Sequence, residues 1–307
     1  MKLFGRRKLR WTVLTSAPGG KAGEQWGDTW FARDLVDALR KQGQDAHTTS
    51  RQNAHALERE QDDVVVVLRG LTEVKPNRSK KNSIWILWVI SHPELVTEEE
   101  ASRYDVVFAA SNHWQPGFVD VRPLLQATNP ARFTPNAGAP DTGDEVLFVG
   151  STRGVFRSIV KDAMEAELSL SLYGVGWQEY VAVEQIKAEF LANDQLPAAY
   201  ASAHVVLNDH HQFMADTGFL SNRLFDAAAT GTRIISDPAL GLSEVFGDFV
   251  RTYSSVEELT AIARDVDAAF PSYSERMKFA AQVAEHHSFS ARATELIAFV
   301  KAARDQN

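Results

Sequence analysis

The sequence predicts an α/β protein with two doubly wound parallel sheets. Short, apolar, β-rich segments recur along the 307 residues, and segments with helical periodicity lie between them. Several β-rich segments are apolar at consecutive positions, which is typical of strands buried on both faces of a parallel sheet. Because strands and helices alternate over the whole chain, we expect parallel sheets covered by helices. The length fits two domains of about 150 residues each.

The expected strands are the apolar segments 11–17, 63–70, 84–91, 104–111, 145–151, 170–174, 204–209 and 232–237. The expected helices are the periodic segments 28–43, 156–168, 196–203, 221–231, 255–270 and 288–307. The first helix places Phe31, Leu35 and Leu39 on one stripe and stops at Gly43. The last helix is expected to be capped by Ser288 or Ser290.

The segment 132–145, RFTPNAGAPDTGDE, divides the chain. It contains two prolines and two glycines and almost no large apolar side chain, which is typical of a linker. We therefore expect an N-terminal domain of residues 1–140 and a C-terminal domain of residues 141–287. Residues 288–307 form a terminal helix that can pack back on the N-terminal domain.

Composition and charge exclude several classes of protein. The net charge of −8 argues against a general nucleic-acid binder, and the lack of cysteine excludes disulfides and thiolate zinc sites. The longest apolar runs have about seven residues, whereas a membrane helix needs about 20. The N-terminal arm MKLFGRRKLR carries five basic residues and no acid. It can contact anionic lipid or be solvated, so we expect a cytoplasmic protein, free or at the inner face of the membrane.

Ligands of open α/β sheets bind beyond the carboxyl ends of the strands, so the residues after each strand are candidates. Gly19 and Gly20 follow the first strand and allow a ligand to approach the backbone closely. Trp26 could stack on a sugar ring, and Asp28 could accept hydrogen bonds from hydroxyls or cap the next helix. His92 follows a later strand and suits general-base work or phosphate binding, with a structural histidine as the alternative.

The second half of the chain offers a phosphate site after its first strand. Gly150, Ser151 and Arg153 follow that strand in the segment LFVGSTRGVFR, where a helix is expected to begin. Helix amides, a hydroxyl and a guanidinium together bind phosphate, although a plain surface turn is the alternative. Further on, Tyr173 and Gly174 end a strand, and Tyr173 could flank a nucleotide base or pack in the core.

The segment DTGFLSNRLFDAAATGTRIISD, residues 216–237, places Asn222 and Arg223 in the first turn of a helix, where free amides and partial positive charge gather. Asp226 follows one turn later on the same face. This arrangement fits a nucleoside diphosphate, with pyrophosphate on the amides and ribose on the carboxylate. The alternative is a surface ion pair between Asp226 and Arg223.

The segment 207–248 resembles the donor-binding core of GT-B glycosyltransferases, and is closest to the family 1 type domains of CgeB-like spore-maturation proteins. The motifs LFVGSTRGVFR, LYGVGW, SAPGGKAGEQWGDTWFA and WVISHPELVT resemble the same group. The resemblance implies two Rossmann-like domains facing across a cleft, with the nucleotide-sugar on the C-terminal domain and the acceptor on the N-terminal domain. It also implies that no metal or other cofactor is needed, because helix amides, arginine and hydroxyls neutralise the leaving diphosphate.

The residues that the resemblance and the patterns assign fall into three groups. His92 and Asp28 are the candidate catalytic bases of an inverting enzyme, and Gly19, Gly20 and Trp26 are the candidate acceptor-binding residues. The candidate donor-binding residues are Gly150, Ser151, Arg153, Tyr173, Gly174, Asn208, Asp209, His210, Phe219, Leu220, Ser221, Asn222, Arg223 and Asp226.

The sequence departs from the family pattern at one position. Many retaining members carry two glutamates separated by seven residues, and here Asp226 stands at the second position and Gly218 at the first. The usual carboxylate contact to the donor sugar is therefore missing or supplied by Asp216 or by backbone amides, which leaves the stereochemistry open.

The expected function is metal-independent transfer of a sugar from a nucleoside diphosphate to an acceptor hydroxyl. The expected partners are accordingly a nucleotide-sugar and a hydroxyl acceptor, without nucleic acid. A nucleotide-sugar epimerase or hydrolase and a catalytically degenerate nucleotide-binding protein are the alternatives.

Overall fold

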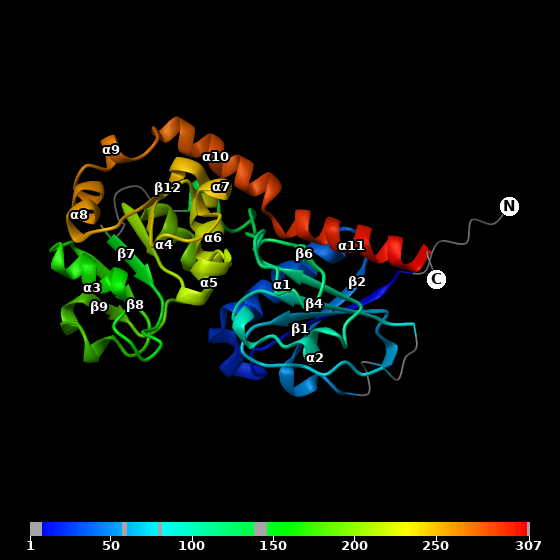
Figure 1. The fold of residues 1–307 in the computed structure, drawn as a ribbon. Helices are drawn as coiled ribbons and strands as arrows, with labels where there is room; N and C mark the ends of the chain where they lie inside the picture. Colours follow the sequence, from blue (N-terminus) through cyan, green and yellow to red (C-terminus); the bar gives the residue numbers. More distant parts are fainter. Residues whose placement is uncertain (1–7, 57–59, 79–81, 138–145, 306–307) are drawn as a thin grey trace. The chain divides into compact units, whose positions relative to one another are not determined.

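A computed structural model describes residues 8–56, 60–78, 82–137 and 146–305 (Figure 1). The chain divides into two compact units, each built around its own six-stranded sheet. Unit 1 comprises Met1–Leu125 and Phe289–Asn307, and unit 2 comprises Gln126–Ser288. Within each sheet every pair of neighbouring strands is parallel, so the expected fold class is confirmed.

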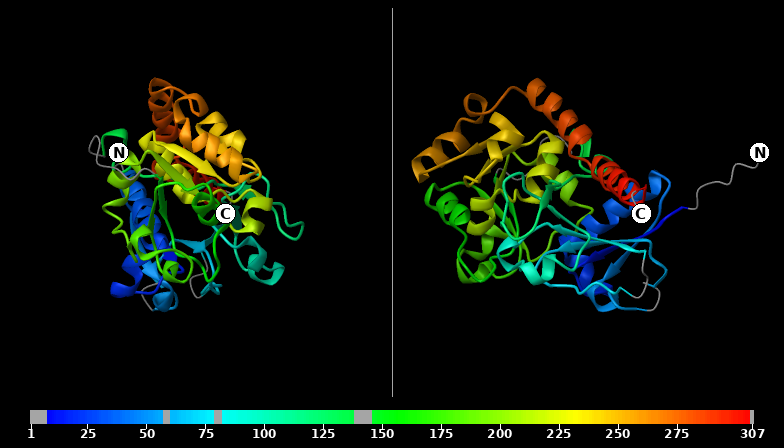
Figure 2. Two further views of the ribbon diagram at one scale, coloured as in Figure 1. Left: turned by 90° about the vertical axis from the view of Figure 1, so that its left-hand side faces the viewer. Right: turned by 45° about the vertical axis from the view of Figure 1, so that its right-hand side comes forward.

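The sheet of unit 1 has the order β2-β1-β3-β4-β5-β6. Its strands are β1 (Arg10–Thr15), β2 (Asp45–Ser50), β3 (Val64–Arg69), β4 (Ile84–Val89), β5 (Val106–Ala109) and β6 (Val121–Pro123). Its α-helices are α1 (Gly27–Lys41), α2 (Glu98–Ala101) and α11 (Phe289–Asp305). Helix α11 packs beside α1, which lies far from it in sequence (Figure 2). Phe31 of α1 makes edge-on ring contacts with Trp88 and with Phe289, and so joins both helices to the sheet.

The sheet of unit 2 has the order β12-β11-β10-β7-β8-β9. Its strands are β7 (Val146–Val149), β8 (Leu170–Tyr173), β9 (Ile186–Ala188), β10 (Val205–Asn208), β11 (Arg233–Ser236) and β12 (Val250–Thr252). Its α-helices are α3 (Ser158–Glu165), α4 (Leu196–Ser202), α5 (Gln212–Thr217), α6 (Asn222–Thr230), α7 (Leu242–Phe246), α8 (Val256–Arg264), α9 (Val266–Ala269) and α10 (Tyr273–His286). The chain starts in the middle of the sheet at β7, builds outward to β9, and then returns to the other side of β7 with β10.

All eight strands expected from the sequence are present, and each is an inner strand of its sheet. The strands that the sequence did not predict are β2, β6, β9 and β12, which are the two edges of each sheet. An edge strand pairs on one side only and is partly solvated, so it does not need a continuous apolar run. The segment DAHTTS of β2 shows this, because it is largely polar and only Ala46 is buried.

Two expectations about helices need correction. The expected helix 255–270 is broken at Asp265, which ends α8 and whose side chain caps α9 by accepting a hydrogen bond from the Ala268 amide at 3.2 Å. Helix α10 was not predicted, although it starts with a capping box in which Ser272 and Glu275 bond to each other's backbone amides. The terminal helix begins at Phe289, directly after Ser288.

The boundary between the units lies after Leu125, earlier than the expected boundary at residue 140. Arg132 donates a 2.8 Å hydrogen bond to the Asn193 carbonyl, and the Phe133 ring stacks on Tyr200, so this part of the expected linker packs on unit 2. Residues 138–145 of that linker lie outside the described residues.

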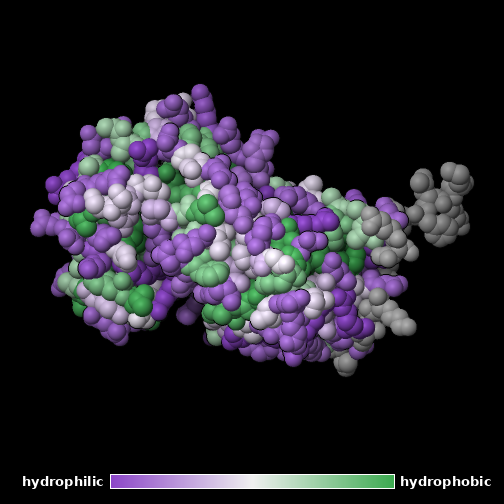
Figure 3. Space-filling model, viewed as in Figure 1, coloured by the Kyte–Doolittle hydropathy of each residue, from purple (hydrophilic) through white to green (hydrophobic). Residues whose placement is uncertain are grey.

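The face shown in Figure 3 mixes hydrophobic residues with hydrophilic ones. Over the described part of the chain, no helix has both the length and the apolar character needed to cross a bilayer.

Candidate functional site

The strand order of unit 2 reverses between β7 and β10, and this switch point is where doubly wound sheets bind their ligands. Gly150 and Ser151 follow β7, and Asp209 follows Asn208 at the end of β10. The sequence predicted that these residues belong to one site, and the adjacent pairing of β7 and β10 brings their strand ends together.

Arg223 reaches this edge from the first turn of α6. Its Nη1 donates to Asn208 Oδ1 at 2.9 Å, and its Nη2 donates to the Val149 carbonyl at 2.7 Å. The guanidinium also lies over the Phe148 ring, 4.9 Å from its centroid. Arg223 is thus held between the ends of both central strands, and burial lowers its pKa.

A second arginine, which the sequence did not assign, pairs with the candidate Asp209. Arg157 Nε donates to Asp209 Oδ2 at 2.6 Å, and Nη2 donates to Oδ1 in the same bidentate pair. Arg157 Nη1 donates to the Ser151 carbonyl at 2.9 Å. Burial and the cations of Arg223 and Arg153 lower the pKa of Arg157. Asp209 therefore pairs mainly with Arg157, and its Oδ1 also lies 3.9 Å from Arg223 Nη1.

Gly150 leaves room for the guanidinium groups of Arg157 and Arg223 to lie close to the backbone. A Cβ atom at this position would lie 2.9 Å from Arg157 Nη1 and 3.0 Å from Arg223 Nη2. Any side chain would displace one guanidinium, so the glycine is required by close approach rather than by its own backbone conformation.

Arg153 is the cation that the protein leaves available. It lies in a turn after β7 at φ 59°, and its side chain has no hydrogen-bond or ion-pair partner within the described ranges. Although the residue is exposed, local burial of the guanidinium and the charge of Arg223 lower its pKa to about 10. The expected helix 156–168 is present as α3, which begins at Ser158, beyond the turn that carries Ser151 and Arg153. The turn itself presents Arg153.

His210 supports the site from inside. Its ring nitrogen Nδ1 lies 2.6 Å from Asp237 Oδ1, and its Nε2 accepts a 3.0 Å hydrogen bond from the Ser221 amide. Because Nε2 accepts, the proton belongs on Nδ1, facing Asp237. The side chain is fully buried. His210 thus fixes the start of α6, and its ring has no nitrogen left for a ligand.

Asp226 is also held by the protein. Its Oδ1 accepts from Thr128 Oγ1 at 2.8 Å, and its Oδ2 accepts from Asn222 Nδ2 at 2.8 Å. The backbones of Thr128 and Ser288 form a β-bridge. The hydrogen bond from Thr128 to Asp226 therefore connects α6 to the segments at which unit 2 begins and ends. Asn222 Oδ1 is buried and accepts no hydrogen bond from the described residues. It is a polar atom that a ligand hydroxyl would satisfy.

The structure places the remaining candidate donor-binding residues at the ends of strands and in the core. The side chains of Phe219 and Leu220 are buried in the core, so only their backbone groups can reach a ligand. Tyr173 is half-buried at the end of β8, and its carbonyl accepts from the Gly150 amide at 2.7 Å. Gly174 follows it at φ 146°.

Unit 1 gathers its candidate residues at the carboxyl ends of β1, β3 and β4. A Cβ atom built on Gly70 would lie 3.2 Å from Ser16 Oγ and 3.5 Å from both Asp28 Oδ2 and Ser91 Oγ, so three side chains converge there. Burial raises the pKa of Asp28 to about 6, against an opposing effect from the charge of His92. The structure therefore brings Asp28 and His92 together, as two catalytic candidates should be.

His92 adopts a left-handed backbone conformation at φ 52°, and its Nδ1 lies 2.9 Å from Glu94 Oε1. Beneath it, the buried pair Arg69–Glu100 is bidentate, with Nε–Oε1 at 2.8 Å and Nη2–Oε2 at 3.1 Å. Arg69 Nη2 also donates to the Leu95 carbonyl at 3.1 Å, which holds the turn that carries His92.

The predicted acceptor-binding residues lie in the loop after β1. The Gly19 amide donates to Gln52 Oε1 at 2.9 Å, and Gly20 has open space where a side chain would be. Trp26 is half-buried beneath the guanidinium of Arg51, 5.8 Å from the ring centroid. Ser16, Gly70 and Ser91 were missed by the sequence interpretation. Ser16 and Gly70 directly follow β1 and β3, and Ser91 lies just beyond the end of β4, so the same strand-end signal could have found them.

Among the described residues, no three His, Asp or Glu side chains are grouped closely enough to hold a metal ion.

Comparisons with known proteins agree with the fold. Residues 153–298 match the family model described as Glycosyl transferase-like. No curated protein sequence is similar enough to the chain to count as a relative. Three similar solved structures are AviGT4, a glycosyltransferase involved in avilamycin A biosynthesis, sucrose-phosphate synthase from Thermosynechococcus elongatus, and T4 phage BGT in complex with UDP and Mn²⁺.

AviGT4 is 17% identical with a TM-score of 0.69, and the match covers 95% of this chain and 97% of that one. Sucrose-phosphate synthase is 14% identical with a TM-score of 0.66, covering 97% and 100%. T4 phage BGT is 12% identical with a TM-score of 0.60, covering 96% and 99%. The family model matches the second half of the chain, and the solved structures show that the whole chain has the fold of the GT-B glycosyltransferases.

Proposed function

We propose that the protein transfers a sugar from a nucleoside-diphosphate sugar to an acceptor hydroxyl. The observation that carries this proposal is the cluster of Arg153, Arg157 and Arg223 at the switch point of unit 2. Asp209 pairs with Arg157 and lies 3.9 Å from Arg223, and the charge of Asp237 also reaches the cluster, so three cations face two carboxylates. Planar guanidinium groups with free N–H donors bind phosphate oxygens well.

The diphosphate would bind Arg153 and the free amides in the first turn of α6. The N-cap residue Ser221 makes no side-chain hydrogen bond to these amides, so the positive end of the helix is available to an anion. As the bond to the sugar breaks, negative charge develops on the diphosphate. Arg153 and the helix amides would stabilise that charge.

The ribose would lie beside Asn222 and Asp226. Asn222 Oδ1 lacks a donor in the described structure, so a ribose hydroxyl would complete its hydrogen bonding. Asp226 would then act mainly by orienting Asn222 through the 2.8 Å bond to Nδ2, with its second oxygen engaged by Thr128. The base would lie near Tyr173 and Gly174.

Asp28 is the candidate base if the reaction inverts the sugar. A carboxyl group with a pKa of about 6 is mostly ionised at neutral pH and is more basic than an ordinary aspartate, which suits removal of the acceptor proton. His92 would orient the acceptor or assist that transfer. If the reaction retains configuration, no protein base is required, and both residues would bind sugar hydroxyls.

We further propose that no divalent cation is needed, since Arg153 and the start of α6 supply the charge that a metal would otherwise supply. T4 phage BGT, which shares the fold, has been solved with UDP and Mn²⁺. Assays with added Mn²⁺ or Mg²⁺ and with excess chelator therefore belong in the test, and loss of all turnover in chelator would overturn metal independence.

The test is a melting-temperature panel with UDP, GDP, ADP, dTDP and CMP, followed by a transfer assay with the sugar of the best nucleotide. A ligand at 100 times its Kd stabilises the folded state by about 2.7 kcal/mol, which is readily detected. No shift with any nucleotide contradicts the donor site. Incubation of donor without acceptor separates transfer from the alternatives, because clean epimerisation or hydrolysis would identify a different enzyme.

A further inference from the structure

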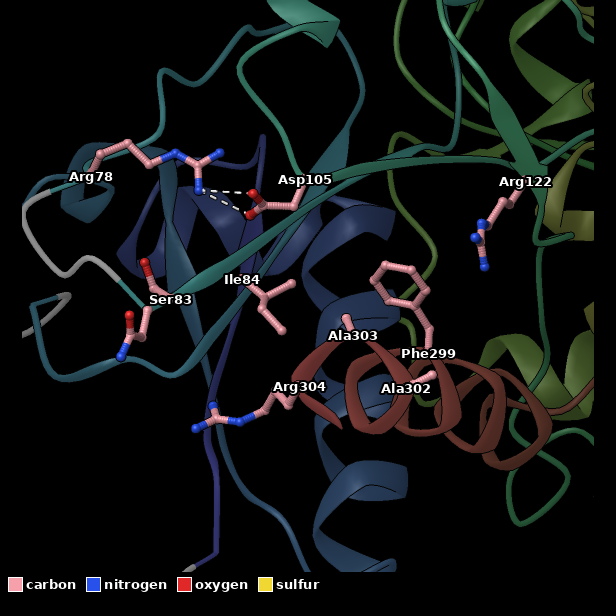
Figure 4. A pocket seen from close by; sticks show the side chains of 10 residues that line it. Arg78, Ser83, Ile84, Asp105, Arg122, Phe299, Ala302, Ala303 and Arg304 are labelled. Atoms are coloured by element: carbon pink, nitrogen blue, oxygen red, sulfur yellow. Dashed lines mark hydrogen bonds and ion pairs between the residues drawn. The ribbon is translucent and has the colours of Figure 1, made fainter. Parts of the chain in front are cut away.

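Unit 1 contains a groove of 960 Å³ at the amino ends of β4 and β5. It is lined by Arg78, Asn82, Ser83, Ile84, Asp105, Arg122, Phe299, Ala302, Ala303 and Arg304 (Figure 4). Ile84 opens β4, whereas His92 follows the opposite end of the same strand. The groove is therefore separate from the candidate residues at the carboxyl ends of this sheet.

One of the three arginines in the groove is already paired. Arg78 Nη1 lies 2.9 Å and 3.2 Å from the two Asp105 oxygens, and Nη2 donates to the Arg103 carbonyl. Asp105 also accepts from the Trp85 amide at 2.7 Å. This network neutralises Arg78 and ties it to the start of β4, which leaves the charge of Arg122 and Arg304.

Arg122 is held in place by an aromatic ring rather than by an acid. Its guanidinium carbon lies 5.0 Å from the centroid of the Phe299 ring, and Phe299 makes an edge-on contact with Phe108 at 5.6 Å. This packing restrains Arg122 while its N–H groups have no hydrogen-bond or ion-pair partner in the ranges that the structure describes.

Arg304 faces the same groove from the last turn of α11. It too lacks a hydrogen-bond or ion-pair partner among the residues described, although the negative end of the helix dipole balances part of its charge. Figure 4 shows Arg122, Arg304 and the Arg78–Asp105 pair placed around Ile84 and Phe299. The groove thus combines two available guanidinium groups with an apolar floor, in a chain whose net charge is −8.

We propose that this groove binds a phosphate-bearing ligand, as a second anion site independent of the proposed donor site. A guanidinium group matches the charge and geometry of a phosphate, and Arg122 and Arg304 offer one on either side of Ile84 and Phe299, whose apolar side chains would receive the carbon skeleton (Figure 4). A neighbouring groove of 410 Å³ shares Arg304 and is lined by Lys8 and Lys301 together with Asp63 and Asp305, so its basic side chains stand among acidic ones.

The phosphate could belong to a soluble phosphorylated molecule or to a lipid headgroup, and both sources offer the same chemistry to Arg122 and Arg304. The apolar floor is compatible with either carrier. Lys8 leads directly into β1, where the basic arm of the sequence ends. Two probes therefore distinguish the sources: inorganic phosphate, and vesicles of phosphatidylglycerol in phosphatidylcholine compared with pure phosphatidylcholine.

The test compares the full chain with Arg122→Gln/Arg304→Gln and with a control, Lys41→Gln/Lys161→Gln, that removes two exposed charges elsewhere. Phosphate binding is read by hydrogen exchange in residues 82–87 and 299–305, which reports this groove and not the donor site. Vesicle binding is read by co-sedimentation. We expect the groove variant to bind at least tenfold more weakly than the wild type and than the control, with nucleotide-induced melting shifts unchanged.

Protection by inorganic phosphate that the groove variant loses supports a soluble ligand. Sedimentation with anionic vesicles alone, lost in the groove variant and kept in the control, supports a lipid headgroup. If neither probe binds, or if the groove variant and the control lose binding equally, the groove is not a phosphate site and the proposal is overturned. Neither result bears on the donor site, whose nucleotide shifts are measured separately.

Discussion

Arg157 and Asp209, which are far apart in sequence, form a buried bidentate ion pair at the carboxyl edge of the second sheet. The Asp209 side chain is 10% exposed and that of Arg157 is 3% exposed, so neither charge could be left alone without a large desolvation cost. The pair neutralises one cation of the cluster. Both carboxylate oxygens of Asp209, a predicted donor-binding residue, are engaged by Arg157.

Replacing Asp209 by Asn should destabilise the protein strongly. The substitution leaves the Arg157 charge buried without its partner, which costs about 3–5 kcal/mol. Urea denaturation measures this loss. The double variant Arg157→Gln/Asp209→Asn should recover part of it, and a double-mutant cycle gives the coupling. A single variant as stable as the wild type would mean that the pair is not buried in solution.

Replacing Arg153 by Gln should weaken nucleotide binding without affecting folding. The side chain makes no hydrogen bond or ion pair within the described structure, so the change in unfolding free energy should stay within about 0.5 kcal/mol. Losing a charge-assisted hydrogen bond to phosphate should weaken binding by about 1.5–3 kcal/mol, or at least tenfold. Calorimetric titration of the wild type and of the variant with the nucleotide measures the two affinities.

The matched control for Arg153 is Arg251→Gln, which removes an exposed arginine that pairs with Asp248 at 3.3 Å on the surface of the same unit. Equal loss of nucleotide affinity in both variants would show a general charge effect and would remove Arg153 from the site.

Asp28 should give the protein a distinctive dependence on pH. Its pKa is about 6 in the folded protein against an ordinary value of 3.8, so the folded state holds the proton more tightly between these values. The contribution of Asp28 to the free energy of unfolding therefore falls as the pH rises from about 4 to about 6. Above that range the buried, ionised carboxylate destabilises the folded state. Asp28→Asn should be more stable than the wild type at pH 7 and equal to it near pH 3.

The same substitution separates a catalytic from a structural role. If Asp28 is the base, kcat/KM of the wild type rises with pH around 6, and Asp28→Asn loses activity by about 10²–10⁴-fold while it gains stability at pH 7. An active Asp28→Asn enzyme with an unchanged acid limb would exclude Asp28 as the base. His92→Gln, assayed in parallel, tests the second candidate.

Replacing Gly218 by glutamate, which the family pattern has at this position, should destabilise the protein. Gly218 ends α5 at φ 75°, a left-handed conformation that costs a side-chain-bearing residue about 1–2 kcal/mol. Gly218→Glu should therefore unfold at lower urea concentration. Gly218→Asn is the control, because Asn tolerates this conformation better. A Glu variant with full stability would show that the turn can relax.

The sequence predicted the inner strands of both sheets because burial on both faces demands consecutive apolar residues, as in the segments that became β3 and β4. Edge strands do not need consecutive apolar residues, and the largely polar β2 was missed for this reason. Local patterns also located Gly150 and Arg223, since strand ends and helix starts are visible in the sequence. The pairing of Arg157 with Asp209 was not visible, because no local pattern links the residue before α3 to the residue after β10.

What the sequence determined by itself was therefore the α/β class, the inner strands, and the residues that each strand end presents. These follow from local periodicity and from the residue types that end strands and start helices. Only the tertiary structure decided which of those residues pair with one another and which keep polar groups available to a ligand. Strand order placed β7 beside β10, and this brought Arg157 to Asp209, buried His210 beneath α6, and left Arg153 as the cation without a partner in the described structure.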